Sequence, residues 1–167
     1  MSLCFIEPQN AIRVIAESVG REARRQILDE LGQAVDQLAV AIDALGEAYE
    51  AADERTAETL ETELFRPVQG AYGRARRTRS GFAERHQLEL DTPPGAAAGA
   101  PSGDPRVHLE RAIAALEQAD QVIAEMQDSM LPVEVGDREL RDGLTAVREL
   151  IAAAPGEARG LVRLSGR

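Results

Sequence analysis

The sequence contains no lysine and no tryptophan, and its single cysteine is Cys4. Without lysine, the chain has neither a Schiff-base nucleophile nor the lysine of a phosphate-binding loop. A lone cysteine excludes an internal disulfide and is typical of a reducing compartment. Aromatic residues make up only 3% of the chain, which argues against sandwiches and barrels, because their strands favour β-branched and aromatic side chains.

Long apolar runs are also missing. No stretch approaches the roughly 18 apolar residues that a membrane-spanning helix needs, and the apolar residues near the start turn polar at Glu7, too early for a secretion signal. We therefore expect a cytoplasmic protein without membrane contact. Its 19 basic residues are all Arg, as in GC-rich bacterial genomes, against 29 acidic ones. The net charge of −10 disfavours generic binding to nucleic acid or anionic membranes.

The most informative pattern is a heptad seam, in which apolar residues alternate at intervals of three and four. The seam consists of Leu28, Leu31, Val35, Leu38, Ile42, Leu45 and Tyr49. It predicts a long helix from about Arg21 to Ala52. Small residues flank the seam on both sides, among them Gly32, Ala34 and Gly46, so we expect a bundle of three or four helices. We also expect the seam to take part in self-association.

Three further segments in the first half of the chain carry helix signals. Residues 9–19 predict a short amphipathic helix, capped by Asn10 and weakened by Gly20, whose apolar stripe is Ile12, Ile15 and Val19. The chain is expected to reverse between Ala52 and Thr56. A less regular helix over 54–88 should kink or split near Phe65–Arg66, because Pro67 lacks a backbone donor.

The second half predicts two more helices. Asp104 and Pro105 form a strong helix start, and Pro132 is expected to end that helix. Asp137 should cap a fourth helix whose face is Leu140, Leu144, Val147 and Ile151. Pro155–Gly156 should interrupt it, and Leu161, Val162 and Leu164 should then either dock as a final helical turn or fray.

These signals together predict an all-α fold: an antiparallel bundle of about four long helices, arranged as two helical hairpins, with a short N-terminal helix. The N-terminal helix and the first hairpin should occupy residues 1–90, and the second hairpin, packed on the first, residues 104–167. Residues 91–103 are rich in Pro, Gly and Ala, a composition that predicts a flexible, disordered linker.

Candidate catalytic residues are few. Neither His86 nor His108 has a Glu three residues before it, which excludes a ferritin-like di-iron site, and a structural or surface role is expected for both. Acidic residues three apart could in principle hold Mg²⁺, as in all-α nucleotide pyrophosphohydrolases, and such pairs occur at Glu47/Glu50, Glu58/Glu61, Glu117/Asp120 and Glu125/Asp128. Because these pairs lie mostly off the apolar seams, we expect no catalytic residue, cofactor or metal.

A basic cluster is the strongest charge anomaly. From Arg66 to His86 there are six Arg and one Glu, a formal charge of +5 within an acidic protein. The candidate binding residues are Arg66, Tyr72, Arg74, Arg76, Arg77, Arg79 and Arg85. Such a run either docks an anionic ligand or neutralises acidic groups of neighbouring helices.

The sequence therefore favours a non-enzymatic interaction protein, such as an adaptor, scaffold or small regulatory subunit, that acts through a protein partner or as a homo-oligomer. A nucleic-acid or phosphate-ligand binder using the Arg74–Arg79 cluster is the second hypothesis. A Mg²⁺-dependent nucleotide pyrophosphohydrolase is the third.

Overall fold

The computed structural model describes residues 8–91 and 103–165, and within these ranges all regular structure is helical. Four long helices form the sides of an elongated bundle: α1 (Pro8–Ala51), α3 (Arg66–Arg85), α4 (Pro105–Asp128) and α6 (Arg138–Ile151). The predicted all-α bundle is confirmed. Within the described residues, no helix is both long and apolar enough to cross a membrane.

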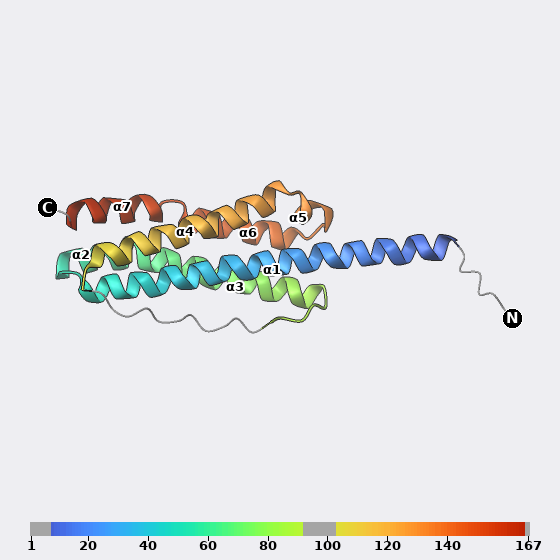
Figure 1. The fold of residues 1–167 in the computed structure, drawn as a ribbon, viewed down its shortest axis with the longest axis horizontal. Coiled ribbons are helices and arrows are strands. Elements are labelled where there is room, and N and C mark those ends of the chain that lie inside the picture. The colour runs from blue at the N-terminus through green and yellow to red at the C-terminus, as the bar shows by residue number, and fades with distance from the viewer. Residues whose placement is uncertain (1–7, 92–102, 166–167) are drawn as a thin grey trace.

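Shorter helices join or extend these four. The connection from α1 to α3 consists of α2 (Glu54–Leu60) and the π-helical turn η1 (Glu61–Phe65). α5 (Leu131–Glu134) lies between α4 and α6, and α7 (Ala154–Ser165) follows α6 along the outside of α4 (Figure 1).

Neighbouring helices of the bundle run antiparallel. α1 packs against α3 and α4, and α6 packs against the same two helices from the other side. α3 and α4 run in the same direction (Figure 1), so the chain between them has to return along the length of the bundle. This topology explains why a long connection separates the two halves. Residues 92–102, most of the predicted linker, lie outside the described residues.

The seam of α1 is the centre of the core. Leu28, Leu31, Val35, Leu38 and Leu45 are buried, and Ile42 packs partly buried beside them. The two predicted hairpins share this core, since α1 packs more extensively on α4 than on its hairpin partner α3. Helices of the same chain therefore cover the seam and leave it no exposed surface for self-association, except at Tyr49, which is 44% exposed.

The first helix is longer than expected. The predicted helices over 9–19 and 21–52 form one continuous helix that begins at Pro8, so Asn10 does not cap it. Glycine in a helix interior costs about 1 kcal/mol relative to alanine, and no proline or competing cap adjoins Gly20. This cost alone does not end the helix.

The predicted reversal and the predicted break are both present. Asp53 caps α2, since its Oδ1 accepts a hydrogen bond from the Thr56 amide at 2.9 Å, and the chain turns back there. The π-helical turn η1 ends at Phe65, two residues before Pro67. A wider turn accommodates a proline ring that cannot donate to the preceding turn.

Two expectations for the second half are corrected. Asp104 caps α4 as predicted, with the Arg106 amide donating to its Oδ1 at 2.9 Å. However, α4 ends at Asp128, two residues before Met130, which adopts φ 65°. Pro132 instead lies in the first turn of the short helix α5, which begins at Leu131. Pro155 and Gly156 do not precede a single final turn, because they lie in the first turn of α7, a helix of 12 residues. Proline is favourable at such a position, where the backbone donor is unused.

Candidate interaction surface

Three members of the predicted basic cluster are engaged within the chain. Arg66 pairs with Glu61 through Nη2 and Oε1 at 3.0 Å. Arg79 is half-buried and lies against Gly32 of α1. Arg85 reaches from the end of α3 to α6, where it binds two carboxylates as described below. These three arginines pair with carboxylates of the same chain or pack against a neighbouring helix. This matches the neutralising role that was predicted as the alternative to ligand binding.

The other members of the cluster are solvent-facing but scattered. The guanidinium carbon of Arg76 lies 5.6 Å from the centroid of the Tyr72 ring, a cation–π distance. Arg74, Arg76 and Arg77 are exposed, and no carboxylate of the described residues lies within ion-pair distance of them. The seven predicted residues therefore do not form one continuous surface.

Asp137 joins the end of α3 to the start of α6. Its side chain is only 5% exposed and accepts hydrogen bonds from Arg85 at 2.9 Å, His86 Nε2 at 3.0 Å and the Leu140 amide at 2.9 Å. Burial alone would raise the pKa of Asp137, but these donors outweigh burial and hold the pKa below 3.8. Asp137 is thus both the predicted cap and a junction that the sequence did not reveal.

His108 has an equivalent structural role at the interface of α1 and α4. It is buried, and its Nδ1 lies 2.8 Å from Oε2 of Glu47, the same oxygen that accepts from Arg111 at 2.8 Å. A buried polar side chain needs such partners. Both histidines therefore have the structural role expected of them.

The acidic pairs that could have held Mg²⁺ are largely occupied by arginine. Carboxylates from the suggested pairs bind arginines in four cases: Glu47 with Arg111, Glu61 with Arg66, Glu117 with Arg159, and Asp120 with Arg148. Hydrogen bonding to Asp120 raises the pKa of Arg148 above its usual value. Among the described residues, no group of three His, Cys, Asp or Glu side chains is arranged to hold a metal ion.

The most conspicuous surface feature is the N-terminal part of α1, which extends beyond the bundle (Figure 1). We call residues 8–22 the projecting segment, since the first buried residue of α1 is Ile27. Three large aliphatic side chains recur on one side of it: Ile12, Ile15 and Val19 are 68%, 62% and 64% exposed. Together with Ala16 they form the N-terminal stripe, which is helical and apolar but has no cover.

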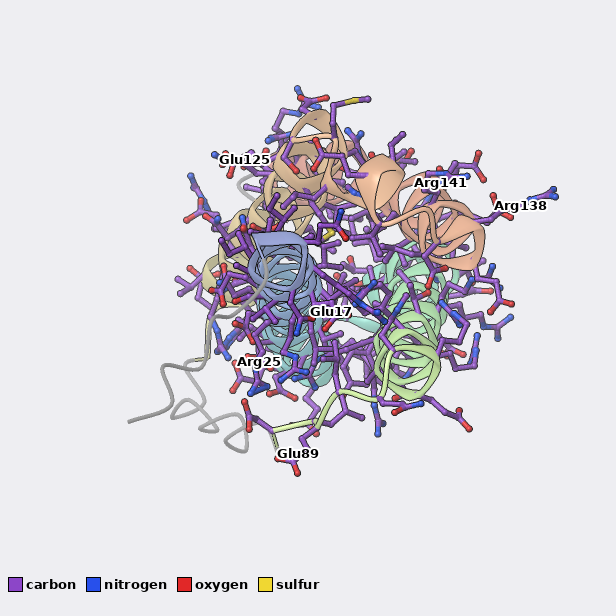
Figure 2. All side chains as sticks on the ribbon, turned by 90° about the vertical axis from the view of Figure 1, so that its right-hand side faces the viewer. Glu17, Arg25, Glu89, Glu125, Arg138 and Arg141 are labelled. Carbon is purple, nitrogen blue, oxygen red and sulfur yellow. The ribbon has the colours of Figure 1, made fainter. Side chains whose placement is uncertain are left out.

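The direction of the N-terminal stripe follows from its spacing. At about 100° per residue, Ile12, Ile15 and Val19 are rotated by about 80–140° from Arg25, which points toward the side of Glu89 in Figure 2. Near the base of the projecting segment, α4 ends and α5 begins (Figure 1). Two more large apolar side chains are exposed in that turn, Met130 at 52% and Val133 at 50%.

Comparisons with protein-family models, with curated proteins and with solved structures find no significant match to this chain. Its function must therefore be inferred from its own residues.

Proposed function

We propose that this chain is a non-enzymatic interaction protein that self-associates through the projecting segment of α1. The observation that carries the proposal is the uncovered N-terminal stripe. A helix of about 15 residues is only marginally stable in water by itself, and exposed apolar surface on a folded protein commonly marks an interaction site. Packing against another helix supplies the missing cover.

The partner that fits this stripe best is a second copy, packed antiparallel. If the twofold axis lies between Ile15 and Ala16, Ile12 of one copy faces Val19 of the other. Ile15 then faces Ala16. Small residues flank the stripe at Ala11 and Ala23, which allows the two backbones to approach closely. Such a symmetric contact closes on itself and gives a dimer.

The length and the charge of the projecting segment also suit an antiparallel dimer. The projecting segment contains two Arg and two Glu and is formally neutral, whereas the whole chain carries −10. Antiparallel pairing brings Pro8 of one copy level with Ala23 of the other, where the bundle begins. The two acidic bundles then lie at opposite ends of the paired helices, so their mutual repulsion is weak.

The expected affinity is modest. Completing the burial of one such aliphatic side chain contributes about 1–2 kcal/mol, hence about 6–12 kcal/mol for the six Ile and Val side chains of the dimer. Association costs about 4–15 kcal/mol in lost freedom. The net gain is therefore at most about 8 kcal/mol, which corresponds to a dissociation constant no tighter than roughly 1 µM.

A matched pair of variants tests the proposal. Ile15→Glu places a charge at the centre of the stripe, whereas Val14→Glu places it on the opposite side of the helix at nearly equal exposure, 61% against 62%. By sedimentation velocity, we expect the wild-type chain and Val14→Glu to dimerise with increasing concentration and Ile15→Glu to stay monomeric. A wild-type chain that is monomeric up to about 1 mM, or equal behaviour of the two variants, would refute self-association through this stripe.

A further inference from the structure

A different unexplained feature lies on the other side of α1, at the base of the projecting segment. A pocket of about 420 Å³ is enclosed by one side of α1 and by the chain that follows α3. Its lining residues are Arg21, Arg24, Arg25, His86, Gln87, Leu88 and Glu89. We call it the basic pocket.

The three arginines converge because of their spacing. Positions i, i+3 and i+4 lie on one side of a helix, so Arg21, Arg24 and Arg25 face the same space. Within the described residues, no carboxylate lies within ion-pair distance of any of them, although Arg85, Arg111 and Arg148 all have such partners. Arg24 Nε is shielded from solvent and has no hydrogen-bond acceptor, an arrangement that an anion would relieve.

The opposite wall is rigid. His86 is held by Asp137 at 3.0 Å and packs on Phe82 with a ring-centroid separation of 4.5 Å. Two backbone hydrogen bonds close the end of α3, from the Leu88 amide to the Ala83 carbonyl at 2.8 Å and from the Gln87 amide to the Glu84 carbonyl at 3.2 Å. The carbonyls of this helix end are therefore used within the chain, and fewer of them face an incoming anion.

We propose that the basic pocket binds a small polyphosphate anion. Guanidinium groups bind phosphoryl oxygens through paired N–H donors, and three of them against the single carboxylate of Glu89 favour a multiply charged ligand. The volume lies in the range of small-molecule sites. Inorganic tripolyphosphate and the phosphate chain of a nucleotide share this chemistry. The pocket and the N-terminal stripe lie on different sides of α1, so this proposal does not depend on self-association.

Titration calorimetry of the full chain with inorganic tripolyphosphate tests the proposal. We expect saturable binding that weakens between about 50 and 200 mM salt. Arg24→Gln, and separately Arg25→Gln, should each reduce the affinity about tenfold or more, since each removes charge-assisted hydrogen bonds. The matched control is Arg74→Gln/Arg77→Gln, which removes two exposed charges elsewhere and should leave the affinity within about twofold.

Titrations with ATP and citrate show which kind of anion the basic pocket prefers. Binding of ATP that is tighter than binding of tripolyphosphate supports a nucleotide, and equal binding supports a site for the phosphates alone. Equal binding of citrate would overturn the assignment to phosphate. The site itself is refuted if millimolar tripolyphosphate releases no heat and leaves the melting temperature unchanged, or if the Arg74/Arg77 control loses as much affinity as Arg24→Gln. Repeating the titration with Ile15→Glu keeps the result independent of the dimer.

Discussion

Gly143 allows a close approach of α6 to Thr78 of α3, and replacing it tests how tightly these helices pack. A Cβ atom added at Gly143 would lie 2.7 Å from Cγ2 and 3.0 Å from Cβ of Thr78, and closer still to Oγ1. Thr78 cannot rotate away from all of these contacts, because its own Cβ is among them. Gly143→Ala therefore forces the two helices apart.

The magnitude follows from two opposing effects. Overpacking a close contact costs about 1–3 kcal/mol. If α6 moves, the core also loses packing around Leu140, Leu144 and Val147, which adds to this cost. Alanine gains up to about 1 kcal/mol over glycine in a helix interior. We expect a net destabilisation of about 1–3 kcal/mol, equivalent to a fall in melting temperature of about 2–12 °C for a chain of this size.

Urea unfolding followed by circular dichroism measures this change. The double variant Gly143→Ala/Thr78→Ala should recover most of the loss, since only the Cβ contact remains. Gly46→Ala is the matched control: it lies inside α1 with nothing within 4 Å of the added atom, and it should be neutral or slightly stabilising. If Gly143→Ala is as stable as Gly46→Ala, α3 and α6 do not pack this closely.

Two further outcomes concern the C-terminal end of α3. Because the pKa of Asp137 is lowered in the folded state, its carboxylate stabilises the fold fully above its ordinary pKa of 3.8, and this stabilisation is lost as pH falls toward the folded-state pKa. Between about pH 5 and 3, the free energy of unfolding in urea should therefore fall more steeply for the wild type than for Asp137→Asn. Parallel curves for the two proteins would contradict this. Gln87 adopts φ 54°, a conformation that glycine adopts without strain. Gln87→Gly should therefore raise the free energy of unfolding by about 0.5–1 kcal/mol. A decrease in the same assay would show that this turn is unstrained.

Local chemistry made much of the fold predictable. Asp104 and Asp137 were predicted to begin helices, and each accepts a backbone hydrogen bond at the start of the following helix. The seam around Leu38 specified one buried side of α1. These signals depend only on neighbouring residues or on helical periodicity, which a single sequence contains.

Long-range partners were not predictable in the same way. Nothing in the sequence near Glu47 indicates that it meets His108, and nothing near Asp137 indicates that Arg85 and His86 will reach it. Such pairs depend on the relative position of helices that are 50 or more residues apart. Pro132 and Pro155 were misinterpreted for a related reason, because a proline that ends one helix and a proline that begins the next look alike.

The basic cluster illustrates a different limit. At about 100° per residue, Arg74, Arg76, Arg77 and Arg79 point in four directions around α3, so residues adjacent in sequence separate in space. Arg21, Arg24 and Arg25 look unremarkable in a charge count but gather on one side of α1. Spacing, rather than density of charge, decides which arginines can act together on a helix.

The same periodicity bears on what can cover the projecting segment. Counting back from Leu28 and Leu31 in heptads, the core register passes through Arg24, Arg21, Glu17 and Val14. Three of these four positions are charged, so the apolar seam weakens where the bundle ends. The apolar residues that reappear at Ile12, Ile15 and Val19 are rotated by about 160° from the core side. Lengthening a bundle helix in its present direction would therefore meet the wrong side of α1. A helix that covers this stripe has to approach from outside the bundle, as the proposed antiparallel second copy would.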